Sequence, residues 1–517
     1  MKMVFAFLFF GFIPAAFYGQ PSGAAAIVRT EAGRISGSRD ASGKISIYKG
    51  IPFAAPPVGD LRWKAPQPVK HWNQVKECNA YGPSPMQNKP VPFSMWTEEF
   101  LIAKEPISED CLYLNVWTPT ASATEKRPVL VWIYGGGFSS GGSSAPIYDG
   151  EAMAKKGLLF VSINYRVGIF GFLADPELTK ESGHEASGNY GLMDQIAALK
   201  WVKQNIAAFG GDPEKVTIAG QSAGSMSVNS LVASPLARGL FVRAIGESGA
   251  SFTKNPKSSG LANAEEQGTK IAQSLGNGTI ASLRKIPAEE LLQKAKGSFS
   301  PVIDGYVLPA SIAQIFNSGK ENPVDLLTGW NQDEGFLSGK IKDAGAYRKE
   351  AEEKYGADAD VFLSLYPGKT DSEAAASQLK VSRDMTFGVQ NYTWANRQSK
   401  QNGSRVYVYR FTRKLPATGE YVKYGAFHTG EVPYAYDNLK FVNRPWEPVD
   451  FQLAKMMSSY WANFVITGNP NGSGLPEWPA YNSNSKMIMF LEEKPGAAEM
   501  PDYKGLDFIY RKMTGGN

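Results

Sequence analysis

Three apolar runs in the first third of the chain constrain the fold more than any other feature. Each run is nearly continuous: LYLNVWT (112–118), PVLVWIY (128–134) and LLFVSINY (158–165). Strands buried on both faces have this pattern, and they belong to parallel sheets covered by helices. Apolar residues then recur at helical spacing between residues 194 and 209, and further strand-like runs follow at 215–219, 241–248 and 323–331. Strands that alternate with helices predict an α/β fold with a large, mostly parallel central sheet flanked by helices.

The N-terminal part of the chain has a different pattern. Lys2 precedes VFAFLFFGFIPAAF (4–17), an apolar run that is too short to span a bilayer but typical of a signal-peptide core. We therefore expect a signal peptide over residues 1–19, cleavage between residues 16 and 26, and export to the periplasm or the medium. No other run reaches about 18 apolar residues, so stable membrane insertion is not expected. Residues 28–54 alternate apolar and polar side chains between glycine turns, which predicts a small antiparallel sheet.

Composition narrows the function classes. The chain is 43% hydrophobic and 20% charged, as is ordinary for a globular protein. The formal net charge of +5 is spread over 517 residues without a block of Lys and Arg, so we expect no nucleic-acid partner. Length alone suggests about three domains. However, no internal repeat and no linker rich in Pro, Gly or Ser marks a domain boundary.

Two stretches match the pattern G-x-S-x-G, which is typical of a nucleophilic serine in a strand–turn–helix elbow. Ser139 lies in GGGFSSGGSS, a run of glycine and serine that indicates a loop. Ser222 follows the apolar run KVTIA and precedes SAGSMSVNSLVAS, which is compatible with a helix. The local context therefore favours Ser222 as the nucleophile.

A serine nucleophile needs a base, and the base needs an orienting group. The chain has three histidines, and only His428 follows Ser222, as the order serine, acid, histidine requires. The acid should lie between them. Asp333 and Glu334 come just after the apolar run 323–331, where α/β sheets collect functional loops. The residues themselves do not decide between these two carboxylates.

An oxyanion intermediate needs backbone N–H donors near the attacked carbonyl. The run VLVWIYGGGF ends in three glycines, which let the backbone approach a substrate closely, and Ala223 offers a further donor after the nucleophile. Other chemistries lack their motifs. HEASG (184–188) does not match the zinc pattern H-E-x-x-H, and YGGGF lacks the phosphate-loop pattern. We therefore expect no metal and no cofactor.

Taken together, these residues resemble the type-B carboxylesterase/cholinesterase family of α/β-hydrolases. FGGDPEKVTIAGQSAG (209–224) is similar to the serine signature of that family, and EDCLYLNVWTP (109–119) to its second signature. Further similar blocks, from residue 27 to about residue 490, include YKGIPFAAPPVGDLRW, NYRVGIFGF, SPVIDGYVLP, TGWNQDEGF, YWANFVITGNPN and LPEWPAY. The resemblance implies an α/β-hydrolase fold and one catalytic domain over residues 27–517.

The resemblance also assigns roles to single residues. It implies that the acid is Glu334 rather than Asp333, with Ser222 as nucleophile and His428 as base. The oxyanion hole would comprise the backbone N–H groups of Gly136, Gly137 and Ala223.

Structural pairs are implied in the same way. An oxidising compartment would permit the two cysteines of the chain, Cys78 and Cys111, to bond. The resemblance pairs them as the first disulfide loop of the family. It also implies two buried ion pairs, Arg62 with Glu109 and Arg166 with Asp194.

The chain departs from many family members at three positions. Tyr134 stands where they have a histidine before the glycines, and this change should not affect the mechanism because backbone groups act there. Gln221 stands where they have a glutamate, which weakens the case for cationic substrates. Trp96 lies in the region where cholinesterases have a choline-stacking tryptophan. Packing within its own loop is the favoured interpretation, and the sequence does not decide whether Trp96 also lines the substrate site.

Two functions from different classes fit this pattern. The first is a secreted serine carboxylesterase that hydrolyses small-molecule carboxylic esters through an acyl-enzyme intermediate. The second is a catalytically inactive cholinesterase-like binding or adhesion protein. The first is favoured because Ser222, Glu334 and His428 are all present. The sequence does not identify the ester or the oligomeric state.

Overall fold

A computed structural model describes residues 23, 25–104, 106–119, 123–253, 259–276, 278–337, 339–401 and 403–514. The expected signal peptide, residues 1–19, lies outside these described residues. Their helices are α1 (Glu151–Lys155), α2 (Gly168–Phe172), α3 (Pro176–Glu181), α4 (Tyr190–Asn205), α5 (Ala223–Ala233), α6 (Leu261–Ser274), α7 (Ile280–Leu283), α8 (Ala288–Lys294), α9 (Ile312–Asn317), α10 (Ala344–Tyr355), α11 (Ala359–Leu365), α12 (Asp371–Arg383), α13 (Val389–Gln398), α14 (Val432–Ala435), α15 (Pro448–Thr467) and α16 (Tyr503–Thr514).

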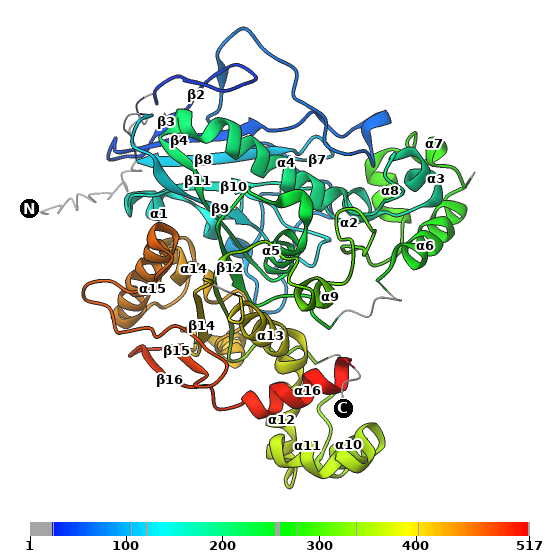
Figure 1. The fold of residues 1–517 in the computed structure, drawn as a ribbon, viewed down its shortest axis with the longest axis vertical. Coiled ribbons are helices and arrows are strands. Elements are labelled where there is room, and N and C mark those ends of the chain that lie inside the picture. The colour runs from blue at the N-terminus through cyan, green and yellow to red at the C-terminus, as the bar shows by residue number, and fades with distance from the viewer. Residues whose placement is uncertain are drawn as a thin grey trace, which may run out of the picture.

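An eleven-stranded sheet forms the centre of the molecule (Figure 1). The strands, in spatial order, are β16 (Gly496–Glu499), β15 (Met487–Leu491), β14 (Val406–Phe411), β13 (Asp325–Asn331), β12 (Arg243–Glu247), β11 (Gly211–Gln221), β9 (Arg127–Ile133), β10 (Leu159–Ile163), β8 (Tyr113–Pro119), β4 (Ile45–Pro52) and β3 (Ser38–Arg39). The strands from β15 to β10 run parallel, and the outer pairs are antiparallel. The prediction of an α/β fold with a large, mostly parallel sheet is confirmed.

The small N-terminal sheet is also present, with one difference from the prediction. It contains β1 (Val28–Arg29), β2 (Arg34–Ser36) and β5 (Lys76–Glu77). β1 and β2 are antiparallel, but β2 and β5 are parallel, so the sheet is mixed. The later part of the predicted region, β3 and β4, instead extends the edge of the large sheet through β8. A further two-stranded sheet joins β6 (Ser84–Pro85) and β7 (Ile107–Ser108).

Helices cover both faces of the large sheet, which explains its apolar strands. α4, α5 and α13 pack on β11, β12 and β13, whereas α1 and α15 pack on strands from β8 to β11. Figure 1 shows these two groups on opposite sides of the sheet. Consequently, residues 129–133 of β9 and residues 158–161 before and within β10 have no exposed surface. Burial of this kind is worth roughly 25 cal/mol per Å² of apolar surface.

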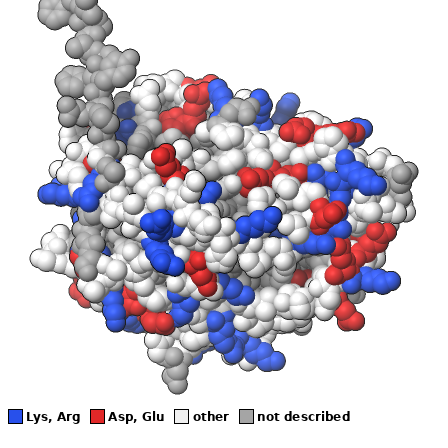
Figure 2. All heavy atoms as spheres, turned by 90° about the horizontal axis from the view of Figure 1, so that it is seen from above, with Lys and Arg blue, Asp and Glu red and all other residues white. Residues whose placement is uncertain are grey.

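A group of helices at the lower end of Figure 1 was not predicted from the sequence. α10, α11, α12 and α16 pack together there, around a hydrophobic cluster that includes Tyr347, Phe362 and Phe508. Within the part of the chain that is described, no helix is long and apolar enough to cross a membrane. On the face drawn in Figure 2, acidic and basic side chains are interspersed.

Candidate active site

A cavity of about 390 Å³ lies where several parallel strands end. Its wall includes the glycine loop Gly135–Gly137 after β9, Ser222 after β11, Phe336 after β13, and His428. Ligands of α/β folds bind at this edge of the sheet, beyond the carboxyl ends of the strands. The topology thus brings together side chains that are far apart in the sequence.

Ser222 lies in a sharp turn between β11 and α5. Its backbone has φ 58° and ψ −124°, a strained conformation for a residue with a side chain. A hydrogen bond from its N–H to the carbonyl of Glu247 (2.8 Å) fixes the turn. Gly220 and Gly224 make the turn sterically feasible, because a Cβ atom on Gly220 would lie 2.5 Å from the Gly224 carbonyl carbon. The strand–turn–helix context predicted for Ser222 is therefore present.

His428 is paired with one of the two candidate carboxylates. Its Nδ1 atom lies 2.8 Å from Oε2 of Glu334, which is completely buried. The other oxygen of Glu334 accepts a hydrogen bond from the backbone N–H of Asn331 (2.8 Å). Glu334 is thus held at both oxygens, and it holds one nitrogen of the imidazole ring.

Asp333 has a different set of contacts. Its carboxylate accepts a hydrogen bond from the backbone N–H of Ala426 (2.9 Å), and its own N–H donates to the Ala426 carbonyl (3.0 Å). These bonds tie the turn that carries Glu334 to the segment that leads into His428. Of the two carboxylates that the residue pattern left open, Glu334 is the one that contacts His428.

Both faces of the His428 ring are covered. The Phe387 ring stacks on it with centroids 4.3 Å apart and an interplanar angle of 15°. The Gln221 amide nitrogen lies 3.3 Å from Nδ1 and 3.1 Å from Nε2. An atom in the ring plane at these distances from both nitrogens would overlap with Cε1, so the amide nitrogen lies over the face of the ring. Phe336 and Trp96 approach the ring edge-on, at 5.6 and 6.3 Å.

Trp96 lines the cavity and also packs within its own loop, so it combines the two placements that the sequence left open. It contacts Phe93 of that loop (4.8 Å), but also stacks on Phe336 (6.0 Å). Its indole N–H donates to the hydroxyl of Thr429, the neighbour of His428 (3.2 Å). The contacts with Phe336 and Thr429 come from distant parts of the chain, and they hold Trp96 at the site.

The glycine loop after β9 lies directly against the Ser222 turn. A Cβ atom on Gly135 would lie 3.0 Å from the Cβ of Ser222 and 2.6 Å from the Gln221 carbonyl. Gly136 has φ 112° and Gly137 has φ 62°, values that favour glycine. Ala223 is the first residue of α5, next to Ser222. The backbone of these residues can therefore approach a ligand closely.

Ser139, the serine of the second G-x-S-x-G match, and Tyr134, which precedes the glycine loop, have contacts of a different kind. Ser139 lines the same cavity, but from a loop, and its hydroxyl donates to the Gly136 carbonyl (3.3 Å). Tyr134 is buried, stacks on Tyr165 (4.4 Å) and donates its hydroxyl to the Tyr165 carbonyl (2.8 Å). The Tyr134 side chain is thus used in packing.

The structure contains both expected ion pairs. Arg62 and Glu109 form two hydrogen bonds of 2.6 Å, and Arg166 and Asp194 form bonds of 2.8 and 2.7 Å. The Arg166–Asp194 pair is almost completely buried.

The disulfide expected between Cys78 and Cys111 is not present. Both cysteines are free and buried. Backbone bonds hold Cys78 beside Ser36 of the small sheet, whereas Cys111 precedes β8 of the large sheet. Burial raises the pKa of the Cys78 thiol to about 11 and that of Cys111 well above its ordinary value, so both thiols are neutral.

Two buried carboxylates behind the site were missed by the sequence analysis. Glu247 accepts hydrogen bonds from Tyr436 (2.9 Å) and Trp461 (2.8 Å), and Glu431 accepts one from Asn331. Burial raises the pKa of Glu247 to about 7 and that of Glu431 well above its ordinary value. No motif around either residue indicates this placement.

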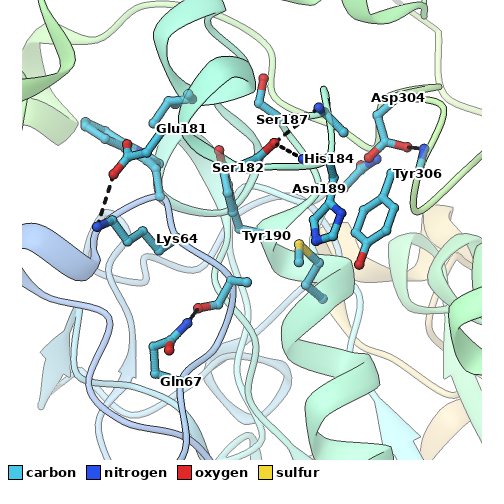
Figure 3. A pocket seen from close by; sticks show the side chains of 15 residues that line it. Lys64, Gln67, Glu181, Ser182, His184, Ser187, Asn189, Tyr190, Asp304 and Tyr306 are labelled. Atoms are coloured by element: carbon cyan, nitrogen blue, oxygen red, sulfur yellow. Dashed lines mark hydrogen bonds and ion pairs between the residues drawn. The ribbon is translucent and has the colours of Figure 1, made fainter.

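A second cavity, of about 250 Å³, does not combine the same groups (Figure 3). The His184 ring stacks on Tyr306 (4.0 Å) there, and no carboxylate bonds to it among the described residues. Asp304 accepts hydrogen bonds from two backbone N–H groups of its own turn. Lys64 and Glu181 form an ion pair (3.0 Å). In the described part of the chain, no group of His, Cys, Asp or Glu side chains could hold a metal ion.

Comparisons with known proteins agree on one family. A profile described as the carboxylesterase family matches residues 24–508. The chain is 36% identical over 496 residues to para-nitrobenzyl esterase of Bacillus subtilis, covering 90% of this chain and 95% of the relative. It is 35% identical over 479 residues to fumonisin B1 esterase of Sphingopyxis macrogoltabida (89% and 85%). Among solved structures, a PNB esterase has a TM-score of 0.80 at 33% identity and covers 94% of this chain and 99% of its own.

Proposed function

This chain belongs to the carboxylesterase family and is a carboxylic ester hydrolase, and we propose that it acts through an acyl-enzyme formed on Ser222. The observation that carries the proposal is the contact of 2.8 Å between His428 and the buried Glu334, in the same cavity as the strained Ser222 turn. A serine hydroxyl becomes a good nucleophile only beside such an oriented base.

In the proposed reaction, Nδ1–H of His428 donates to Glu334, which leaves Nε2 free to accept a proton. Ser222 Oγ attacks the ester carbonyl carbon while its proton passes to Nε2. The same proton then goes to the leaving alcohol as the carbon–oxygen bond breaks. Water attacks the acyl-enzyme in the same way, which releases the carboxylic acid and restores Ser222.

The backbone N–H groups of Gly136, Gly137 and Ala223 are proposed to stabilise the oxyanion. Positive φ angles at Gly136 and Gly137 and the close approach of this loop to Ser222 support this role. Donors fixed in advance stabilise the charge that develops in the transition state, and losing one typically costs about 10²–10³-fold in kcat.

The cavity indicates the kind of ester. Among the described residues that line it there is no Lys, Arg, Asp or Glu, and several side chains are aromatic. We therefore propose an uncharged ester with apolar groups as substrate. The neutral Gln221 over the His428 ring agrees with this, because a cationic alcohol would find no negative side chain there.

We also propose that the protein is exported, which rests on the apolar run 4–17 and the small residues after it. The mass of the mature protein recovered from the producing cells tests this, since cleavage should remove the first 16–26 residues.

One catalytic domain over residues 27–517 is supported by a main hydrophobic core that includes residues from Ala25 to Leu506.

Hydrolysis of chromogenic acetate and butyrate esters tests the proposed function. The wild-type protein should hydrolyse them. Ser222→Ala should leave only a small residual rate, which substrate binding and the oxyanion hole still supply. An intact, folded protein without any esterase activity would favour the alternative, an inactive binding or adhesion protein.

A further inference from the structure

Four charged side chains form a buried cluster below the candidate site. Arg383 and Asp384, at the end of α12, meet Arg410 of β14 and Asp502, which precedes α16. Arg383 donates to Asp384 (2.7 Å) and to Asp502 (2.7 Å), and Arg410 donates to both oxygens of Asp502 (3.2 and 3.1 Å). The side chains are at most 6% exposed. Moving four charges out of water costs free energy, and their mutual attraction offsets this cost only if the geometry of the pairs is good.

The cluster forms hydrogen bonds with the turn that carries Glu334. Arg383 donates to the backbone carbonyl of Gln332 (3.4 Å), and Arg410 donates to the Gln332 side chain (3.2 Å). Gln332 is the first residue after β13 and lies two residues before Glu334. Gly335 lies directly on the last turns of α12, because a Cβ atom there would be 2.3 Å from the Leu379 carbonyl.

The same cluster also holds the segment that carries Phe387. Asp384 begins a π-helical turn, Asp384–Gly388, which continues α12. The second carboxylate oxygen of Asp384 accepts a hydrogen bond from the Tyr366 hydroxyl (2.9 Å). Single π-turns inside helices are frequent at functional sites. Here the turn places the Phe387 ring flat against His428.

We infer that the Arg383–Asp384–Arg410–Asp502 cluster is a positioning device for His428, an inference that rests on the function proposed above. Glu334 and Phe387 are two of the groups that fix the imidazole, one at Nδ1 and one on a ring face, and both belong to segments that the cluster holds. The four residues touch neither substrate nor reacting atoms. They act through the positions of the two groups that contact the base.

Burial acts on the charges of the cluster in different ways, because it raises the pKa of Asp384 and lowers that of Arg410. Burial by itself would raise the pKa of Asp502, but the guanidinium groups of Arg410 and Arg383 outweigh burial and hold that pKa well below its ordinary value. Asp502 therefore keeps its charge over the pH range of an activity assay, so a shift of the acid limb in Asp502→Asn would report on the base. Glu334 contacts the base directly, and the charges of Glu334 and Glu247 both act on the buried Glu431.

Two variants test the inference. Asp502→Asn removes the carboxylate that both arginines share, and Asp384→Asn is the milder change, because asparagine keeps the shape and an acceptor for Tyr366. A misplacement of about 1 Å can cost on the order of 10²-fold in rate. We therefore expect kcat to fall by roughly 10- to 100-fold with KM changed far less. The acid limb of kcat/KM should move to lower pH, because a displaced Glu334 stabilises the imidazolium less.

The matched control is Glu109→Gln, which breaks the buried pair with Arg62 in a different part of the fold. It should lower the thermal stability but leave the pH profile and kcat close to those of the wild type. Asp502→Glu, which restores the charge, should recover part of the lost kcat.

The outcomes separate this inference from the proposed function. If folded Asp384→Asn and Asp502→Asn keep the kcat and acid limb of the wild type, or if Glu109→Gln has the same effect as they do, the cluster is merely structural and the inference is wrong. If instead an organophosphate fails to label Ser222 in the wild-type protein, the proposed function itself fails.

Discussion

Replacing Gln221 by glutamate would place a negative charge over the His428 ring, where the wild-type protein has a neutral amide. The amide nitrogen lies 3.1 and 3.3 Å from the two ring nitrogens. A carboxylate at about 4 Å attracts an imidazolium by roughly 1 kcal/mol in water and roughly 4 kcal/mol near a protein surface. At 1.36 kcal/mol per pH unit this corresponds to about 0.7–3 units. The added charge stabilises the protonated base. As pH falls, the variant should therefore lose activity at a higher pH than the wild-type protein.

The assay is the pH profile of kcat/KM for a neutral ester, whose acid limb reports protonation of the base in the free enzyme. Gln221→Met is the matched control, because it removes the amide contacts without adding a charge. The acid limb should move upward in Gln221→Glu and not in Gln221→Met. Turnover of acetylcholine relative to 3,3-dimethylbutyl acetate, its uncharged analogue, should rise only in Gln221→Glu.

Burial limits the size of the effect. Gln221 is 2% exposed, and Glu334, Glu431 and Glu247 already lie nearby, so a new carboxylate is itself harder to ionise. The smaller end of the range is therefore the one to expect. If the acid limb and the preference for the cationic ester both stay unchanged in a folded Gln221→Glu protein, the electrostatic reasoning about this position is refuted.

Two further predictions concern other carboxylates. Glu334→Gln should lower kcat by about 10²–10⁴-fold, because it removes the charge that orients and stabilises the imidazolium, whereas Asp333→Asn should cost far less; the opposite ranking would contradict the contacts with His428. Burial raises the pKa of Glu247 from 4.5 to about 7. Between these values the folded chain binds more protons than the unfolded chain, so the free energy of unfolding falls by up to roughly 3 kcal/mol as pH rises. Glu247→Gln should remove that loss, and the difference in Tm between pH 5 and pH 8 should shrink; an unchanged difference would show that Glu247 is not its source.

The sequence predicted those parts of the fold that local patterns determine. Apolar runs identified the strands of the parallel sheet because both faces of each strand are covered. Ser222 and His428 could be selected from their context and order along the chain. The prediction of Glu334 rather than Asp333 as the acid rests on the family resemblance, since two adjacent carboxylates differ only in what they contact after folding.

The remaining features depend on contacts between distant segments, which no local pattern encodes. Phe387 reaches His428 only because a π-helical turn continues α12, and Trp96 reaches it through a bond to Thr429. Arg383 lies in a stretch of ordinary helical sequence, and its partner Asp502 is 119 positions further along the chain. The family resemblance paired the two cysteines, but both are free and buried in the structure.

Covalent labelling tests the central claim most directly. A fluorophosphonate reacts with a serine that a neighbouring base activates, so it should abolish esterase activity at one equivalent per chain. Mass spectrometry of the digested protein should then find the label on a single peptide, the one that contains Ser222, and Ser222→Ala should remain unlabelled. A label on Ser139, or full activity in Ser222→Ala, would contradict the account.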